Sequence, residues 1–350
     1  MFVGGEFYED EAWVTDTPAP PIEDAIFLNG GRACLSVIAT YLKAKNYDTV
    51  LLPSYLCPTI LDVLDKNLIR YEFYQINDDL SIDLDDLWVK AGHHQVIYFI
   101  NYFGFQHSPE TLSVLSQLQS ACKLLIEDNA QAGFPLKRIG DFCFNSMRKF
   151  TAFDGGYLAT RNTPFHYFDP LPFLENRRLP LIREYRHRLR DYLFQRRGSH
   201  EELERLFYQA ERYYEQDNVI LGDDDERHRI EHLNWQAIKT ARRANYEYLC
   251  GKIVDLPDIK PIYPALQPDN MPLGLPVYIS INTRDLLIEK LAEMSISLTV
   301  HWDALLTDPR TRNNPGVANI AGRILTLPVD QYTSRSQLNF LVDALTKLIL

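Results

Sequence analysis

Short apolar runs alternate with helical stretches along the first 160 residues, and this alternation constrains the fold more than any other feature. Residues 31–45 have the periodicity of a helix, while Pro58 and the Ser108-Pro109 pair mark the starts of two more. The apolar runs between them predict strands at 49–52, 69–76, 96–100, 123–127, 142–145 and 156–160. Strands that alternate with helices are typical of a mostly parallel sheet covered on both faces. The sequence therefore predicts an α/β fold.

The remaining segments indicate how the chain is divided. Residues 1–25 carry acids and prolines, including PAPP at 18–21, and we expect them to form a surface arm. A large domain follows over 26–232, with a helical, densely charged insertion at 171–217, and a smaller α+β domain occupies 233–350. In and just before the smaller domain we expect a loop at 223–227, helices at 232–250 and 334–348, and strands at 277–281, 297–301 and 324–327.

The composition excludes several classes of protein. With 46% hydrophobic residues in 350, the chain is able to bury a sizeable core. A net charge of −11 disfavours nucleic-acid binding, which needs a basic surface. The start, MFVGGEFYEDEAW, has no signal-peptide pattern, and no apolar run approaches the ~18 residues of a membrane span. Five scattered cysteines without a CxxC pair indicate a reduced, cytoplasmic protein, and no pattern predicts a metal site.

The segment IEDNAQ places Asp128 at the carboxyl end of the strand predicted at 123–127. In open α/β sheets this edge is where ligands bind. One interpretation is an aspartate that ends the strand and caps the next turn. The other is a carboxylate that pairs with the protonated pyridine nitrogen of pyridoxal phosphate, because a pyridinium is a far better electron sink than a neutral pyridine.

Lys149 follows the strand predicted at 142–145 and lies 21 residues after Asp128, within FNSMRKFTAFDGG. Most lysines are exposed, so a solvated loop lysine is one interpretation. The alternative is a lysine that forms a Schiff base with the cofactor. Partial desolvation and a nearby cation lower the basicity of an amine, which suits it to imine chemistry and to proton transfer. Ser146 and the glycine pair that follows would let a hydroxyl and the backbone approach a phosphate.

Two glycines, Gly30 and Gly31, open the helix predicted at 31–45, and Arg32 follows them. The free N–H groups of a helix start, together with the helix dipole, form an anion-binding site. The pattern is equally typical of an ordinary glycine-containing helix start.

Together these motifs resemble the DegT/DnrJ/EryC1/StrS family of pyridoxal-phosphate-dependent sugar aminotransferases, and the resemblance runs over most of the chain. The most specific part is IEDNAQ at 126–131, followed by SMRKF and DGG within 146–156. Other segments match in the same order: GGEF at 4–7, GGRACL at 30–35, LPSYLCPT at 52–59, INYFGF at 100–105, ARRANYEYL at 241–249, PLGLPV at 272–277, VHW at 300–302 and ILTLPVDQ at 324–331. The resemblance implies the aminotransferase fold, with a large cofactor-binding domain and a small C-terminal domain.

The resemblance also implies a role for each matching residue. Lys149 would hold pyridoxal phosphate as a Schiff base and move the proton during catalysis, and Asp128 would pair with the pyridine nitrogen. Gln131 would lie near the ring hydroxyl. Ser146 and the helix start at 30–32 would hold the phosphate.

Two positions stay open in this comparison. In the family an aromatic residue covers the ring face shortly after the PS segment, and here that place is occupied by Cys57, with Tyr55 two residues earlier. Asn101 and Tyr102 are further candidates for the same contact. The family also supplies an asparagine or arginine from the neighbouring subunit to the phosphate, for which Asn234 is the candidate, and so the resemblance implies a homodimer.

Arginines are concentrated between residues 177 and 197, although the whole chain is acidic. Apolar residues recur there at helical spacing, so one interpretation is an amphipathic helix with a solvated basic face. The other is contact with an anionic group of the substrate, such as a nucleotide diphosphate. The arginines proposed for this contact are Arg177, Arg178, Arg183 and Arg186. His301 and Trp302 either pack in the interior or border the substrate pocket.

The resemblance implies an aminotransferase that moves an amino group from an amino acid, with glutamate the expected donor, to a keto sugar on a nucleotide carrier. Such an enzyme would serve cell-surface polysaccharide biosynthesis. Alternatives within the same fold are an enzyme that acts on a non-sugar carbonyl and a dehydratase, although the family's dehydratases replace the lysine that is present here as Lys149. A further alternative is a sensor or scaffold that binds pyridoxal phosphate without turnover.

Overall fold

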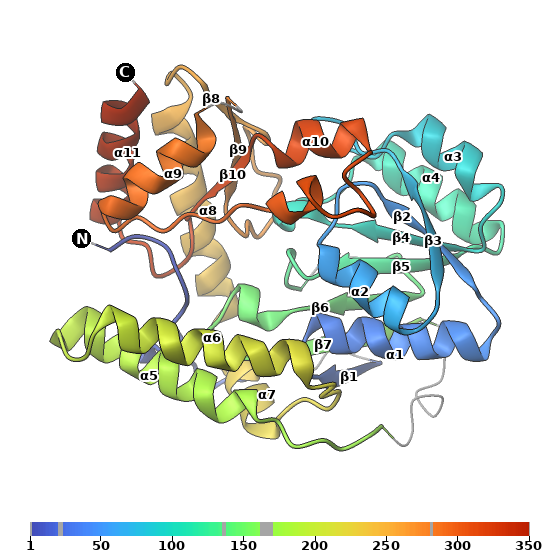
Figure 1. Cartoon of the computed structure of the whole chain (residues 1–350), viewed down its shortest axis with the longest axis horizontal. Helices are drawn as coiled ribbons and strands as arrows, with labels where there is room; N and C mark the ends of the chain where they lie inside the picture. Colours follow the sequence, from blue (N-terminus) through green and yellow to red (C-terminus); the bar gives the residue numbers. More distant parts are fainter. Residues whose placement is uncertain (1, 20–23, 135–137, 162–170, 281–282, 350) are drawn as a thin grey trace.

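A seven-stranded sheet forms the centre of the protein, and a three-stranded sheet lies beside it (Figure 1). The structure is a computed structural model that describes residues 2–19, 24–134, 138–161, 171–280 and 283–349. The predicted PAPP segment therefore lies partly outside the described residues. No helix in the described ranges is both long and apolar enough to span a membrane.

The large sheet has the strand order β1-β7-β6-β5-β4-β2-β3. Its strands are β1 (Ala25–Leu28), β2 (Thr49–Pro53), β3 (Arg70–Tyr74), β4 (Val96–Ile100), β5 (Leu124–Asn129), β6 (Phe142–Asn145) and β7 (Gly156–Thr160). Five neighbouring strands, from β3 to β6 in the sheet, run parallel, and β7 is antiparallel to both of its neighbours. The prediction of a mostly parallel sheet is confirmed.

Helices cover both faces of this sheet, as Figure 1 shows. The helices α1 and α2 pack against each other on one face, and α3 and α4 pack against each other on the opposite face. Their bounds are α1 (Gly31–Ala44), α2 (Pro58–Lys66), α3 (Leu84–Ala91) and α4 (Pro109–Ser120). As predicted, Pro58 occupies the first turn of α2, and the Ser108 hydroxyl accepts a hydrogen bond from the Thr111 amide at the start of α4. The strands between these layers are buried almost throughout, which explains their continuous apolar sequence.

The smaller domain is built on an antiparallel sheet of order β10-β9-β8. Its strands are β8 (Ile259–Pro261), β9 (Leu275–Ile279) and β10 (Ile324–Leu327), and its helices are α8 (Trp235–Ile253), α9 (Arg284–Glu293), α10 (Pro315–Ala321) and α11 (Arg335–Ile349). In sequence, three helices separate the two sheets: α5 (Arg178–Gln195) and α6 (His200–Gln216), which form a helical hairpin, and the short helix α7 (Asp224–Glu231). Short 3₁₀ helices occur at Glu11–Trp13, Tyr102–Gly104, Met147–Lys149 and Asp303–Leu306.

Three expectations about local structure are wrong. Residues 223–227 are not a loop but the start of α7, because the Asp223 carboxylate accepts hydrogen bonds from two first-turn amides and acidic residues favour a helix N-terminus. Residues 297–301 form no strand: only Thr299 makes an isolated bridge, with Thr326. The arm is not entirely at the surface, since Val3 is fully buried and pairs with Ile296 of the small domain.

Arg242 of α8 links the small domain to the loop that follows β6. Its side chain is fully buried and donates hydrogen bonds to the Gln331 side chain (2.7 Å) and to the carbonyls of Pro272 and Leu273 (3.1 Å each). Gln331 in turn donates to the carbonyl of Phe150 (2.7 Å). Arg242 also donates directly to the Phe150 carbonyl (3.4 Å), so one buried cation satisfies acceptors from three separate segments.

We predict that Arg242→Met lowers the free energy of unfolding by about 3–5 kcal/mol, because it leaves several buried acceptors without a donor. The measurement is urea unfolding followed by circular dichroism. The matched control on the same helix is Gln236→Ala, an exposed side chain that should change stability by less than about 0.5 kcal/mol. Equal stability of the two variants would contradict this account of Arg242.

Candidate active site

A cavity of about 140 Å³ lies at the carboxyl edge of the parallel strands. Parallel strands end at the same edge, so residues from the ends of β4, β5 and β6 meet there. The register places Ile100, Asp128 and Phe144 in one row across these three strands, and all three line the cavity. The wall also includes residues from α1, α2, α6 and the segment before Asp303: Gly31, Arg32, Cys57, Tyr214 and Trp302.

Asp128 lies in the middle of this row, on β5, and only 5% of its surface is exposed. Its carboxylate accepts hydrogen bonds from the Tyr98 hydroxyl (2.6 Å) and from the amide of Ala130 (2.7 Å). Burial raises the pKa of Asp128 to about 6, although these hydrogen bonds and the charge of Lys149 act in the opposite direction. A cation placed against this carboxylate would offset the cost of its burial.

Lys149 lines the same cavity from the 3₁₀ helix after β6. Burial lowers the pKa of Lys149, and the positive charge of Arg148 lowers it further. The amine is therefore a weaker base than an exposed lysine, as a nucleophilic or proton-transferring lysine requires. The sequence prediction placed Asp128 and Lys149 in one site, and the structure brings them to one cavity.

The glycine pair after Asp154 allows the lysine loop to fold back on the sheet. Gly155 has φ +140°, and a Cβ there would lie 2.1 Å from the Phe27 ring. A Cβ on Gly156 would lie 2.3 Å from the Asn145 carbonyl. Both positions therefore exclude larger residues, and the Met147 amide closes the loop by donating to the Gly155 carbonyl (2.8 Å).

The predicted anion site is formed by the start of α1 and by Ser146. Gly30 precedes the helix with φ +99° and provides no side-chain cap, so the first-turn amides keep their capacity to bind a ligand. Ser146 is 5% exposed, lines the cavity, and its hydroxyl makes no hydrogen bond to any residue in the described ranges. A Cβ on Gly31 would touch the Ser146 Cβ at 3.6 Å, so the two segments are in close contact.

Only one of the two polar side-chain atoms of Gln131 forms a hydrogen bond within the described part of the chain. Its Oε1 accepts a hydrogen bond from the Phe103 amide (3.0 Å), which fixes the orientation of the side chain. Its Nε2 is buried and has no partner within the described part of the chain. A buried donor without an acceptor is costly, and here it belongs to a residue that lines the cavity.

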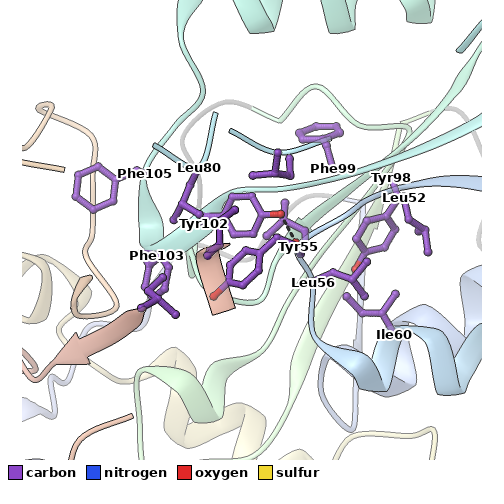
Figure 2. Packing of buried hydrophobic residues seen from close by; sticks show 14 of the residues in the cluster. Leu52, Tyr55, Leu56, Ile60, Leu80, Tyr98, Phe99, Tyr102, Phe103 and Phe105 are labelled. Atoms are coloured by element: carbon purple, nitrogen blue, oxygen red, sulfur yellow. Dashed lines mark hydrogen bonds between the residues drawn. The ribbon is translucent and has the colours of Figure 1, made fainter. Parts of the chain in front are cut away.

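Of the candidates for covering a ring in the cavity, Cys57 lines it and Tyr55, Asn101 and Tyr102 do not. Trp302, which was expected either to pack in the interior or to border the substrate pocket, also lines the cavity. Tyr55 is fully buried in the core, where its hydroxyl donates to the carbonyl of His301 and its backbone carbonyl accepts from Tyr102 (Figure 2). Side chains two residues apart on a strand point to the same side. Those of Tyr55 and Cys57 do not, because α2 begins immediately after Cys57. The Tyr55 ring packs against Trp302 with centroids 5.0 Å apart, and Trp302 in turn lines the cavity.

His301 lies behind the cavity wall. Its side chain is buried, and Nδ1 is 2.9 Å from the Thr326 hydroxyl. Burial and the charge of Lys149 lower the pKa of His301 to about 3, so the imidazole is neutral at physiological pH. Asn234, the candidate for a contribution to a second subunit, caps α8 by accepting a hydrogen bond from the Ala237 amide (3.0 Å).

The four arginines proposed for a substrate contact do not line the cavity. Each pairs with carboxylates of the chain: Arg177 with Asp217, Arg178 with Asp154 and Glu211, Arg183 with Asp223 and Glu226, and Arg186 with Asp154 and Glu226. Arg178 and Arg186 are each only 3% exposed. The interpretation as a solvated basic face is wrong for these two residues, and the positions of all four give no support to a diphosphate contact.

Tyr98, Arg148 and Tyr214 are among the cavity residues that were not identified from the sequence. Tyr98 could have been found, because it lies two residues before the end of a predicted strand and therefore on the same face as Ile100. Arg148 directly precedes Lys149 and was a visible signal. Tyr214 is on α6, and no feature of the sequence indicates that this helix reaches the sheet.

Solved structures of sugar aminotransferases have the same fold as this chain. CalS13 of Micromonospora echinospora matches with a TM-score of 0.64 and 18% identity over 93% of this chain and 87% of its own. PseC of Helicobacter pylori, an aminotransferase of pseudoaminic acid biosynthesis, matches with 0.68 and 14% over 93% and 86%. Spr1654 of Streptococcus pneumoniae, assigned as a sugar aminotransferase and solved in its pyridoxal-phosphate form, matches with 0.71 and 14% over 99% and 98%. No protein-family model and no curated protein sequence matches the chain. The aminotransferase fold expected from the sequence is confirmed.

The raised pKa of Asp128 predicts how the ligand-free protein responds to pH. A carboxyl with a folded-state pKa of about 6 and an ordinary value of 3.8 stabilises the fold below pH ~4, and this contribution is lost as the pH rises through 6. We therefore expect Asp128→Asn to gain stability relative to wild type between pH 4 and 7, by up to about 3 kcal/mol. The measurement is urea unfolding of the apo-protein across this range.

The control for this experiment is Asp343→Asn, which removes an exposed carboxylate of α11. Loss of this exposed side chain should change stability by less than about 0.5 kcal/mol at pH 7. A stability difference for Asp128→Asn that does not change with pH would mean that burial of this carboxylate is compensated within the protein.

Proposed function

We propose that the protein is a pyridoxal-phosphate-dependent aminotransferase that transfers an amino group from an amino acid to a keto sugar. The observation that carries this proposal is that one cavity contains the buried Asp128, the weakly basic Lys149 and the anion-binding helix start at Gly31. The similarity in fold to structures named as sugar aminotransferases supports the reaction class and the sugar acceptor.

The residues of the cavity fit the cofactor. The unpartnered Nε2 of Gln131 is a donor for the ring hydroxyl, and the free hydroxyl of Ser146 is a donor for the phosphate. The carboxylate of Asp128 is available to a protonated ring nitrogen, which would stabilise its charged form. These three side chains would hold the ring at its hydroxyl, phosphate and nitrogen positions.

When bound, pyridoxal phosphate supplies an electron sink that stabilises negative charge at the α-carbon of the amino donor. Asp128 would hold the protonated ring nitrogen, and Tyr98 fixes the Asp128 carboxylate by donating a hydrogen bond to it. Lys149 would hold the cofactor and would accept or release a proton at Nζ, for which its lowered pKa is suited. Trp302 and Cys57 line the same cavity and would reduce the access of water to a bound ligand.

Finer features of the proposal rest on the sequence resemblance. We propose glutamate as the amino donor, a nucleotide-linked keto sugar as the acceptor, and a cytoplasmic homodimer with His301 and Trp302 bordering the substrate region. The retained Lys149 disfavours a dehydratase of this fold. Four arginines are not proposed as ligands of the acceptor, because each already forms an ion pair with a carboxylate of the chain: Arg177, Arg178, Arg183 and Arg186.

The test of the proposed function uses the donor half-reaction, which needs no acceptor. Addition of L-glutamate to the purified yellow protein should remove the cofactor's visible absorption and release one equivalent of 2-oxoglutarate per site. A nucleotide-linked keto sugar should then restore the absorption. An absorption that stays unchanged with every amino acid of a donor panel would instead support a non-catalytic binding protein.

We predict that borohydride reduction fixes the cofactor on Lys149, because this amine lines the cavity beside Asp128 and has a lowered pKa. Peptide mapping by mass spectrometry identifies the labelled residue. Lys149→Ala should lose the label and the half-reaction, whereas the control Lys260→Ala, an exposed lysine of β8, should keep both. A label on any other lysine would overturn the assignment.

A further inference from the structure

We propose that α6 completes the phosphate end of this cavity within a single chain, with Tyr214 and Arg148 as ligands of a phosphate group. The inference rests on the proposed function, because the phosphate is taken to be that of the cofactor. It assigns to α6 a part in binding that the sequence did not indicate.

The first observation is the position of the Tyr214 hydroxyl. A Cβ on Gly30 would lie 3.3 Å from this hydroxyl and 3.9 Å from the Ser146 Oγ, so both hydroxyls flank the start of α1. Tyr214 and Ser146 both line the cavity, and neither hydroxyl has a hydrogen-bond partner among the described residues. Two free hydroxyl donors therefore converge on a helix N-terminus whose amides are also free.

The second observation is a cluster of guanidinium groups around the Tyr214 ring. The guanidinium carbons of Arg32, Arg148 and Arg178 lie 4.5, 4.6 and 5.0 Å from the ring centroid. Cations at this distance are attracted to the face of an aromatic ring. The ring thus holds in place two arginines, Arg32 and Arg148, that line the cavity.

The arginines of this cluster outnumber the carboxylates that pair with them. Arg148 and Arg178 share the carboxylate of Glu211, at 3.1 and 2.8 Å, and Arg178 also pairs with Asp154, which Arg186 shares. Arg32 donates only to the backbone carbonyl of Tyr214 (3.0 Å), and no carboxylate in the described ranges pairs with it. A phosphate dianion is the ligand that matches two hydroxyl donors, free helix amides and an excess of guanidinium charge.

The same chemistry would suit the diphosphate of a nucleotide-linked substrate. We assign it to the cofactor because Ser146 lies three residues and Arg148 one residue before Lys149, on the loop that carries the proposed attachment point. A group held there is within reach of the residue that binds the cofactor covalently. The experiment below separates the two sources.

The probes are pyridoxamine 5′-phosphate and pyridoxamine, which differ only in the phosphate and bind without a covalent bond to Lys149. Titration calorimetry with the apo-protein should show that Tyr214→Phe weakens binding of the phosphorylated probe by about 10-fold or more, as expected for the loss of a hydrogen bond to a charged group. Binding of pyridoxamine should be unchanged. Arg148→Lys, which keeps the charge but loses the planar fork, should give a loss in the same direction.

The matched control is Tyr213→Phe on the same helix. The Tyr213 ring packs against Arg177, 4.6 Å from its guanidinium carbon, and lies outside the cavity. This variant should bind both probes as wild type does. Equal losses for both probes in Tyr214→Phe, or no loss for either, would overturn the proposal. A loss confined to binding of uridine diphosphate would also overturn it, because the site would then belong to the acceptor.

An experiment with inorganic phosphate distinguishes a failure of this inference from a failure of the proposed function. Phosphate should raise the melting temperature of the wild-type apo-protein and raise it less in Tyr214→Phe. If wild type binds neither pyridoxamine probe but keeps this phosphate effect, the proposed function fails and the anion site stands. If phosphate stabilises wild type and Tyr214→Phe equally, the assignment of Tyr214 fails.

Discussion

The loop that carries Lys149 is held by the buried carboxylate of Asp154, and much of the surrounding structure is arranged around that group. Arg178 and Arg186 of α5 both pair with it, and the Asp154 amide donates to Glu226 of α7 (2.6 Å). Asp154 and both arginines are at least nine-tenths buried. Removing one partner from such a network leaves an uncompensated buried charge, which typically costs about 3–5 kcal/mol. The helical hairpin is therefore a support of the active-site loop rather than an appendage.

This network explains why a basic segment occurs in an acidic chain. Its arginines are matched by carboxylates that are distant in sequence, at 154, 211, 217, 223 and 226. From the sequence alone this local reversal of charge was interpreted as a solvated face or a substrate contact, because ion pairs between residues 24 to 43 positions apart leave no periodic signal. The same limit applies to Tyr214, whose position depends on how α6 docks against α1 and the lysine loop.

The large sheet and the pair of Asp128 and Lys149 were predictable, and the reason is topological. Apolar runs of strand length identify the strands, and parallel strands necessarily end at one edge. Polar residues that follow two such runs must then approach each other, even without knowledge of the strand order. The ring-covering residue was not predictable in this way, since Tyr55 and Cys57 differ by only two positions. Which of them faces the cavity depends on where α2 begins and on the docking of Trp302 from the small domain.

The two ends of the cavity favour opposite charges on a bound ligand. At one end the carboxylate of Asp128 is buried, and burial raises its pKa to about 6 in spite of its hydrogen bonds, so a cationic partner would stabilise its charged form. At the other end Arg32 and Arg148 provide more positive charge than Glu211 neutralises. A ligand that stabilises both ends must carry a positive charge at the Asp128 end and a negative charge at the arginine end. The ring nitrogen and phosphate of pyridoxal phosphate have this distribution, and a ligand of uniform charge would satisfy one end at the expense of the other. The lowered pKa of Lys149 follows from the same arrangement, because Arg148 serves the anion-binding end while it destabilises the charged amine next to it.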